Sequence, residues 1–485
     1  MNRVFEAVIG LEVHIQLRTR SKLFCACPAE YGAEPNSRTC PVCLGLPGAL
    51  PVLNREAVRM ALTLGLALDG KIQPSSLFYR KQYFYPDLPK GYQITQGPVA
   101  IVQGGSLAIP GDPVVRGAEG PILAGIERAH LEEDAGKSLH DGSEKGSLVD
   151  LNRAGVPLLE IVGRPELRSP QEASDYLKTL HRLVTALDIC DGNMEEGSFR
   201  CDANVSLRPR GAAALGTRVE IKNLNSFNQV KRALDFEIAR QGELLGKGQA
   251  PSQETRGWDA DQGETRPQRT KEAAMDYRYF PEPDLPPLVV TLEEVEAVRR
   301  GLPELPEARR HRLAARHGLT DYEAGTLLQS RAFGDFFEAA AAGGHGKQVA
   351  HWMLGDISRT LNETRKEIGE LGLRPQDLAE LVDLVEAGTV NLTTARGVLY
   401  PALLRGEGRP REFVAVHGLA QVSNPEVLRA LVRQVLKAHP GQVAELKSGR
   451  EALRGFLVGQ VMKAGKGQAN APLVNEILAE ELGQD

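Results

Sequence analysis

Two stretches of this chain alternate apolar with polar residues and would place acids and bases along one side of a strand. They are residues 5–17 and 200–208. Their polar sides carry Glu12, His14, Arg200, Asp202 and Asn204. Since side chains alternate across a pleated strand, each stretch would bury its apolar row and present its polar row. Carboxylate, imidazole and guanidinium groups on a rigid sheet suit the chemistry of Mg²⁺ and phosphate.

Further carboxylates recur in the same part of the chain. They are Glu132, Glu133, Asp134, Glu160, Glu195 and Glu196. A Mg²⁺–ATP site requires a few carboxylates that coordinate the hard cation and a cationic side chain that meets the phosphate oxygens. Histidine is a softer ligand, so His14 argues for a mixed site that also tolerates Mn²⁺. The alternative is that each acid is a surface charge or the partner in an ion pair.

Four of the six cysteines lie close together in the sequence. They are Cys25, Cys27, Cys40 and Cys43. Two close pairs joined by a short loop can form a tetrahedral zinc site, and four thiolates leave no position open for water. We therefore expect a structural Zn²⁺ module over residues 25–43. The alternative is a set of reduced thiols in a loop.

An aromatic stretch at residues 78–92 contains four of the ten tyrosines together with Arg80, Lys81 and Lys90. Aromatic rings interleaved with cations could stack on a nucleotide or on RNA. They could equally line a polar channel. Core packing under a loop is the interpretation that this stretch favours by itself.

The C-terminal region is basic although the whole chain has a net charge of −5. Residues 405–466 contain eleven Lys or Arg and five Asp or Glu, a local charge of +6. One helix would end at Gly465 or Gly467, and a new helix would open at Asn470. Lys463 and Lys466 belong to the loop between these helices, where lysines can meet a phosphate backbone. They are also ordinary charges at a helix C-terminus, and the basic segment can be a solvated helical surface.

Two sequence motifs that are typical of particular enzymes are absent from the chain. The chain has no Gly-x-x-x-x-Gly-Lys-Ser/Thr loop, so an ATP site here would not be a P-loop. It also has no Gly-x-Ser-x-Gly elbow and no other evident nucleophile for attacking an amide. If the protein uses ammonia, that ammonia must come from elsewhere.

The elements that position these residues change in character along the 485 residues. Residues 1–291 read as strands with a few helices, one of which begins at a capping box at Ser169. Helices dominate residues 292–406, one of them capped at Thr320. A break near residues 406–410 separates a helical tail at 407–485, where Asn424 caps a further helix. This pattern predicts an α+β domain with a mixed or antiparallel sheet, followed by two helical domains. No apolar run is long enough to span a bilayer, so we expect a cytoplasmic protein.

Eight motifs together resemble one family, the B subunits of the tRNA-dependent amidotransferase that converts Glu-tRNA(Gln) to Gln-tRNA(Gln) or Asp-tRNA(Asn) to Asn-tRNA(Asn). The motifs are IGLEVH (9–14), YFYPD (83–87), LEEDAGKS (131–138), MEEGS (194–198), RCDANVSLR (200–208), KNLNSF (222–227), DYRYFPEPD (276–284) and GKGQAN (465–470). They run from end to end, so the resemblance covers the whole chain.

The resemblance implies a glutamine-synthetase-like cradle, a helical middle domain and a tail that recognises tRNA. In this family the cradle phosphorylates the side-chain carboxylate of the mischarged tRNA with Mg²⁺–ATP, and ammonia then displaces the phosphate. The amidase subunit of the same complex supplies that ammonia through a channel, and a small third subunit holds the pair together. The synthetase that mischarges the tRNA is a further candidate partner. The sequence does not show whether Glu-tRNA, Asp-tRNA or both are used.

The resemblance also implies roles for particular residues. His14, Glu133 and Glu160 would hold Mg²⁺ with Glu12 close by, and Lys90 and Glu133 would lie where ammonia arrives. Glu133, Lys90 and Glu12 are the expected catalytic residues. The expected wall of the nucleotide site consists of Arg200, Asp202, Glu195 and Glu196. Lys463 and Lys466 would contact tRNA.

Two other functions fit parts of the pattern. A nonenzymatic, zinc-containing tRNA-binding scaffold would explain the cysteines and the basic tail but would leave the strand-borne acids unused. A free-standing ATP-dependent amide ligase acting on a small acid, like glutamine synthetase itself, would need neither tRNA nor a partner protein.

Overall fold

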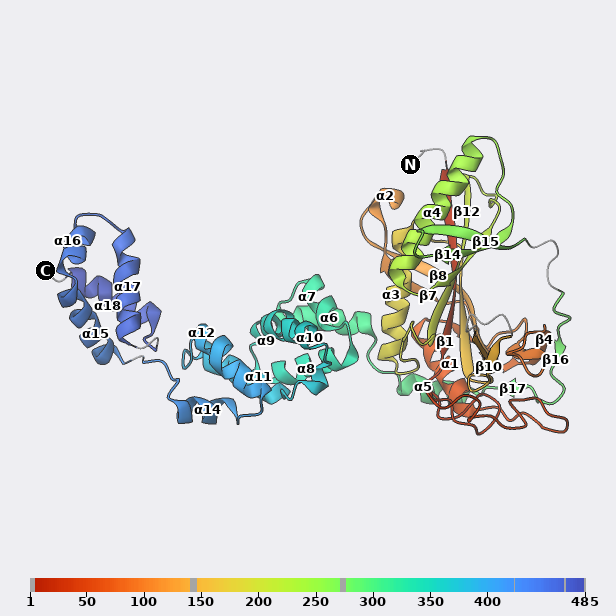
Figure 1. The fold of residues 1–485 in the computed structure, drawn as a ribbon, viewed down its shortest axis with the longest axis horizontal. Helices are drawn as coiled ribbons and strands as arrows, with labels where there is room; N and C mark the ends of the chain where they lie inside the picture. Colours follow the sequence, from red (N-terminus) through yellow and green to blue (C-terminus); the bar gives the residue numbers. More distant parts are fainter. Residues whose placement is uncertain (1–4, 140–145, 271–275, 423, 466–467, 484–485) are drawn as a thin grey trace. The chain divides into compact units, whose positions relative to one another are not determined.

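The computed structural model describes residues 5–139, 146–270, 276–422, 424–465 and 468–483, which form two compact units, Met1–Pro306 and Glu307–Asp485. The N-terminal unit contains the strands and the first helices, and the C-terminal unit is helical (Figure 1). The coarse prediction of a mixed α/β region followed by a helical region is therefore confirmed.

The strands are β1 (Phe5–Gln16), β2 (Lys71–Ile72), β3 (Ser75–Ser76), β4 (Phe78–Gln82), β5 (Tyr92–Gln96), β6 (Val102–Gln103), β7 (Ser106–Pro110), β8 (Pro121–Glu133), β9 (Lys137–Leu139), β10 (Leu148–Asp150), β11 (Pro157–Gly163), β12 (Phe199–Pro209), β13 (Val219–Leu224), β14 (Glu254–Asp259), β15 (Glu264–Thr270), β16 (Phe280–Pro281) and β17 (Leu288–Val289).

The α-helices are α1 (Arg55–Ala67), α2 (Pro113–Arg116), α3 (Pro170–Ala186), α4 (Phe227–Gly246), α5 (Leu292–Arg300), α6 (Pro306–His317), α7 (Asp321–Leu327), α8 (Arg331–Ala340), α9 (Gly346–Trp352), α10 (Ser358–Thr364), α11 (Pro375–Glu386), α12 (Leu392–Thr394), α13 (Tyr400–Leu404), α14 (Pro410–His417), α15 (Pro425–Ala438), α16 (Pro440–Lys447), α17 (Ala452–Ala464) and α18 (Ala471–Gly483). Short 3₁₀ or π segments are η1 (Ala341–Gly343), η2 (Met353–Ile357), η3 (Ile368–Glu370) and η4 (Ala395–Leu399).

One large sheet organises the N-terminal unit. Within the described part of the chain it has thirteen strands, and its main path runs β15-β14-β13-β12-β1-β11-β8-β5-β4-β16. Its described strand pairs are antiparallel except β13 with β14, which is parallel. The two alternating stretches of the sequence are β1 and β12, and they are neighbours in the sheet, with Glu12 opposite Asp202.

Helices cover the apolar side of these central strands. The apolar rows of β1 and β12 belong to the same buried core as residues of α1, α3 and α4. In Figure 1, α3 and α4 lie side by side against the sheet. Val13, between Glu12 and His14, is fully buried, whereas its two polar neighbours are half-buried. This alternation leaves the polar row of the strands available to form a site.

The N-terminus of α3 differs in one detail from the sequence prediction. The Ser169 hydroxyl accepts the N–H of Glu172, as a capping residue should. The Glu172 carboxylate does not complete a capping box, because it accepts hydrogen bonds from the Arg116 guanidinium at 2.7 and 2.8 Å and from the Arg168 N–H. A buried carboxylate is better stabilised by a bidentate guanidinium than by one main-chain N–H.

The C-terminal unit contains two separate hydrophobic cores, one formed by residues between 313 and 414 and one by residues between 428 and 478. The predicted caps at Thr320 and Asn424 begin α7 and α15. Helix α14 packs on α11 and contributes Phe413 to the first of these cores, although the sequence placed it in the tail. Helix α5 packs on α1, so the N-terminal unit continues beyond residue 291. Among the described residues, no helix is long and apolar enough to cross a membrane.

Candidate active site

Strand register brings the acids and bases of four segments onto one side of the sheet. His14 on β1 lies opposite Glu160 on β11 and opposite Arg200 on β12. Glu160 in turn lies opposite His130 on β8. Residues directly opposite each other in neighbouring strands point to the same face, so these side chains converge.

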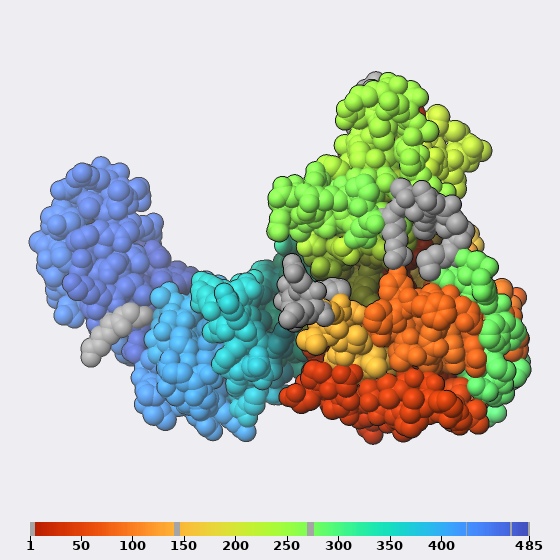
Figure 2. Space-filling view, turned by 45° about the vertical axis from the view of Figure 1, so that its right-hand side comes forward, coloured from red at the N-terminus to blue at the C-terminus, as the bar shows by residue number. Residues whose placement is uncertain are grey.

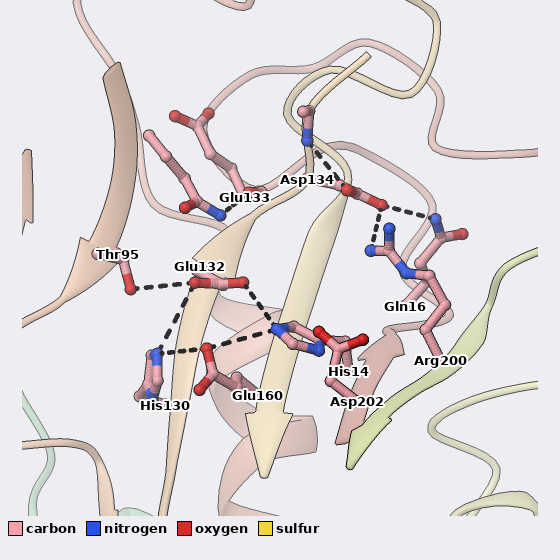
Figure 3. A network of polar contacts seen from close by, with 12 residues as sticks. His14, Gln16, Thr95, His130, Glu132, Glu133, Asp134, Glu160, Arg200 and Asp202 are labelled. Carbon is pink, nitrogen blue, oxygen red and sulfur yellow. Dashed lines mark hydrogen bonds and ion pairs between the residues drawn. The ribbon is translucent and has the colours of Figure 1, made fainter. Parts of the chain in front are cut away.

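The convergence produces a compact cluster, which we call the His–Glu cluster: His14, His130, Glu132 and Glu160 (Figure 3). Nε2 of His14 lies 3.4 Å from Glu160 Oε2 and 3.7 Å from Glu132 Oε1. Nε2 of His130 lies 3.3 Å from Glu160 Oε2 and 3.7 Å from Glu132 Oε2. The possible ligand atoms of His14, Glu132 and Glu160 all lie within 4.8 Å of one another.

The electrostatics of the His–Glu cluster suit a cation. Burial disfavours the charged form of both imidazoles, but the carboxylates of Glu160 and Glu132 outweigh it. The pKa of His14 is therefore raised, and that of His130 is raised to about 9. Burial opposes ionisation of Glu160, yet the two histidines hold its pKa well below the usual range. The two carboxylates stabilise the protonated, positively charged forms of the two imidazoles. They would stabilise a divalent ion in the same way, once the imidazoles have lost their protons.

Glu133 occupies a different place from the one the resemblance implied. Its side chain is directed away from the His–Glu cluster (Figure 3), and its carboxylate pairs with the ammonium of Lys90 and accepts a main-chain N–H of β5 at 2.9 Å. Glu132 lies with His14 and Glu160 instead. The reason is the alternation along β8, which directs adjacent side chains to opposite faces. Lys90 and Glu133, both expected where ammonia arrives, form an ion pair with each other.

Glu12 and Asp202 extend the acidic surface across β1 and β12. Glu12 accepts a hydrogen bond from the Asn204 amide at 2.9 Å. Its pKa is raised because it is buried and because Glu160 and Asp202 are close. Asp202 accepts a hydrogen bond from the Lys222 ammonium at 2.6 Å. Glu12 therefore lies beside the cluster, whereas Asp202 already has a cationic partner.

The other residues expected to bind nucleotide are more dispersed. The Arg200 guanidinium shares the face of His14 and donates to Asp134 at 2.9 Å. Its Nε is buried without a hydrogen-bond partner among the described residues. Glu195 and Glu196 are exposed in the turn before β12, where their N–H groups donate to the Asn193 side chain.

A cavity of about 430 Å³ opens beside the His–Glu cluster. Its lining includes Tyr79, Lys81, Thr95, Arg128, His130, Glu132, Glu160 and Tyr279. The Lys81 ammonium stands 4.9 Å from the centre of the Tyr277 ring, and it has no ion-pair partner in the described part of the chain. Glu132 and Glu160 outweigh its burial, so the pKa of Lys81 is raised. The aromatic stretch of the sequence therefore contributes an unpaired cation to this cavity.

The four clustered cysteines do come together. Sulfur atoms of Cys25, Cys27, Cys40 and Cys43 lie within 4.8 Å of one another. The hydrogen bond from Cys25 and the N–H of Cys40, 3.1 Å from Cys43 Sγ, lower the pKa of Cys43 to about 4, although burial opposes this. A thiolate surrounded by three more thiols fits a tetrahedral zinc-type site.

One of the two lysines proposed to contact tRNA lies within the described residues. Lys463 is exposed in the last turn of α17. Lys466 lies outside the described residues. Helix α17 ends at Gly465 and α18 begins after Asn470, as the sequence predicted.

Sequence reasoning did not select three residues that the structure places at the site. Glu132 lies in one of the eight motifs and Lys81 in the aromatic stretch, but Glu133 and Lys90 were preferred. His130 directly precedes the motif that contains Glu132. The available signal was the alternation of side chains along a strand: residues 130 and 132 point to the same face if β8 continues to residue 133. Choosing that face required the register of β8 against β11, which no local pattern encodes.

Comparison with known protein families shows two matching domains in this chain. Residues 7–296 match the GatB/GatE catalytic domain, and residues 335–482 match the GatB domain. The His–Glu cluster, the cavity beside it and the Lys90–Glu133 pair all lie within the first of these.

Full-length relatives extend the match to the entire chain. Proteins from Halorhodospira halophila, Geobacter sulfurreducens and Myxococcus xanthus are 53%, 50% and 48% identical over 480, 482 and 482 residues, which is 99% of this chain and 99% of each relative. All three are named as the B subunit of aspartyl/glutamyl-tRNA(Asn/Gln) amidotransferase. The chain belongs to this family of amidotransferase B subunits.

Proposed function

We propose that this chain carries out ATP-dependent transamidation of mischarged Glu-tRNA(Gln), Asp-tRNA(Asn) or both, as the B subunit of a larger ligase. The observation that carries the proposal is the convergence of His14, Glu132 and Glu160 at the edge of a cavity that also holds the unpaired Lys81. Its overall setting would be a glutamine-synthetase-like cradle. The names of the relatives support the reaction class.

The His–Glu cluster is the proposed Mg²⁺ site. His14, Glu132 and Glu160 would hold the ion, with Glu12 beside them, and their nitrogen and oxygen donors also suit Mn²⁺. When bound, the ion would neutralise charge on the phosphate oxygens of ATP. Arg200, Asp202, Glu195 and Glu196 remain the proposed wall of the nucleotide site.

The cavity would receive the aminoacyl end of the tRNA. The side-chain carboxylate enters as an anion, and the Lys81 ammonium would orient it toward the His–Glu cluster. One carboxylate oxygen then attacks the γ-phosphorus of ATP, the bond to the β-phosphate oxygen breaks, and ADP leaves. A carboxylate is a poor acyl donor, so the new acyl phosphate provides the leaving group that amide formation requires.

Lys90 and Glu133 would act in the second step. Ammonia attacks the activated carbonyl carbon, and phosphate departs with the oxygen that came from the carboxylate. The departing phosphate would take the proton that the nitrogen loses. The Lys90–Glu133 pair, which faces away from the cavity, would stand where ammonia arrives. With side-chain exposures of 8% and 3%, the pair is shielded from bulk water, which would protonate free ammonia.

The remaining proposals concern partners. The amidase subunit would supply ammonia from glutamine, the small third subunit would hold the complex together, and Lys463 and Lys466 would contact tRNA. A non-discriminating synthetase is a candidate donor of the mischarged tRNA. Zn²⁺ would occupy the four cysteines, and the complex would work in the cytoplasm.

The test combines the purified chain and its amidase and small partner proteins with ATP, glutamine and each mischarged tRNA. We expect ATP consumption that requires mischarged tRNA, with Gln-tRNA or Asn-tRNA identifying the substrate. Glu160→Gln should lower ATP consumption at least 100-fold and leave tRNA binding unchanged. ATP turnover with ammonium and a small acid alone would instead indicate a free-standing ligase. Tight tRNA binding without ATP turnover in the wild type would indicate a scaffold.

A further inference from the structure

The four-cysteine loop and the Lys90–Glu133 pair share one small cavity of about 180 Å³. Its walls include Lys22, Cys25, Cys43, Gly45, Lys90 and Glu133. Figure 2 shows the N-terminal loop segment, coloured red, packed directly beneath the orange segment to which Lys90 belongs. A cysteine module whose only role was local stability would have no need of this position.

Gly45 of the cysteine loop packs against Lys90. It is the last residue of the turn at 41–45 that contains Cys43, and its N–H donates to the Val42 carbonyl at 3.1 Å. Its φ of +67° is one that glycine adopts without strain. A Cβ atom at this position would overlap Cγ of Lys90 and lie 3.2 Å from its Cβ. The backbone of the cysteine turn therefore forms one wall of the channel that holds the Lys90 stem.

Lys22 connects the cysteines to the same region by charge. Its side chain is fully buried, and its amine donates to the Arg38 carbonyl at 2.8 Å and to Cys43 Sγ at 3.7 Å. No carboxylate lies within ion-pair distance of it in the parts of the chain that the structure describes. A buried cation needs compensating negative charge, and a thiolate–metal centre provides it.

Main-chain hydrogen bonds then join this loop to the end of β8. The N–H of Leu23 donates to the Gly155 carbonyl at 2.8 Å, and the N–H of Gly155 donates to the Asp134 carbonyl at 2.9 Å. Asp134 follows Glu133 directly. Lys90 and Glu133 are thus each attached to the cysteine loop, one by packing and one through this short chain of hydrogen bonds.

We propose that the four-cysteine module is the positioning element of the Lys90–Glu133 pair, so that a bound zinc-type metal keeps Lys90 in place for amide transfer. The proposal rests on the proposed function of that pair. Loss of the metal, or oxidation of the thiols, would loosen the turn at Gly45. Amide formation would then be impaired relative to the ATP-dependent activation of the carboxylate. The His–Glu cluster lies on the other side of β8, so carboxylate activation would continue.

The chain offers a matched pair of variants for the test. Gly45→Ala places a methyl group against Lys90. Gly48→Ala imposes similar backbone strain in the same loop, at φ +84°, but its Cβ meets nothing within 4 Å. Both are assembled with the amidase and small partner proteins. The readouts are zinc content, ATP consumed with mischarged tRNA, and amide formed as ammonium is titrated.

We expect Gly45→Ala to raise the KM for ammonium at least tenfold while zinc content and ATP consumption stay within twofold of the wild type. Gly48→Ala should match the wild type in all three. Equal behaviour of the two variants would overturn the proposal. A wild-type complex without any ATP-dependent amidation would instead overturn the proposed function, so the two failures are distinguishable.

Metal removal gives a second, independent readout if Gly45→Ala does not assemble. Chelation of the wild-type complex should increase modification of Lys90 by an amine-reactive anhydride at least fivefold, because its side chain is only 8% exposed. Restoring Zn²⁺ should reverse the increase. Unchanged Lys90 modification, or equal loss of ATP consumption and amide formation, would refute the coupling.

Discussion

Two adjacent glutamates of β8 provide the sharpest prediction, because the structure gives them different tasks. Glu132→Gln and Glu133→Gln are chemically identical changes at neighbouring positions. The first removes a negative charge from the His–Glu cluster, and the second removes the partner of Lys90. We expect Glu132→Gln to weaken divalent-ion binding and Glu133→Gln to leave it within threefold of the wild type.

The expected loss of ion affinity in Glu132→Gln follows from the distances within the His–Glu cluster. Glu132 oxygens lie 3.7 Å from the Nε2 atoms of both His14 and His130, so an ion among these groups would be at least as close. Two unit charges about 4 Å apart interact by about 4 kcal/mol at an effective dielectric constant of about 20. Desolvation offsets part of this. A loss of about 2 to 4 kcal/mol corresponds to a roughly 30- to 1000-fold higher Kd.

The assay is titration of the assembled complex with Mn²⁺, followed by the electron paramagnetic resonance signal of the free ion, without ATP. Amide formation with saturating ammonium is measured in parallel. Glu133→Gln should lower it while Mn²⁺ affinity is retained. The reasoning is refuted if Glu133→Gln abolishes Mn²⁺ binding and Glu132→Gln does not. Thermal unfolding of both variants controls for loss of the fold.

Three further outcomes are expected. Glu172→Gln should destabilise the chain by about 1 to 3 kcal/mol near neutral pH, in chemical denaturation followed by circular dichroism. Burial raises the pKa of Glu172, but the Arg116 guanidinium outweighs burial and lowers it. The stabilisation from the ionised Glu172 is therefore complete above the unfolded pKa of about 4.3 and is lost as the pH falls through the lower folded pKa. In acid, the wild type and Glu172→Gln should have the same free energy of unfolding. Cys27→Ser should reduce zinc content at least fivefold by atomic emission; full retention would mean that the four thiols do not form the site. Lys81→Met should raise the KM for mischarged tRNA roughly 10- to 150-fold, since one charge-assisted hydrogen bond contributes about 1.5 to 3 kcal/mol; an unchanged KM would show that Lys81 does not bind the substrate.

Local patterns predicted the elements well. Period-two alternation identified β1 and β12, and the capping residues Ser169 and Thr320 identified the starts of α3 and α7. These signals lie within a few residues of the structure they specify. The clustering of the four cysteines was also predictable, because their spacing is short and local.

The arrangement of the His–Glu cluster could not be obtained in the same way. Whether Glu132 or Glu133 meets Glu160 depends on the register between β8 and β11. A shift of one residue exchanges the two faces of a strand, and the sequence between them does not fix it. Likewise, Glu172 left its expected capping role because Arg116, distant in sequence, offered a stronger partner.

Transfer of an isotope would test the central claim, that the substrate carboxylate is activated by phosphorylation before ammonia attacks. Mischarged tRNA labelled with ¹⁸O in both side-chain carboxylate oxygens is converted by the complex with ATP and glutamine, and the phosphate released is analysed by mass spectrometry. One ¹⁸O atom should appear in phosphate for each amide formed. Amide formation with no ¹⁸O in the phosphate would contradict the account.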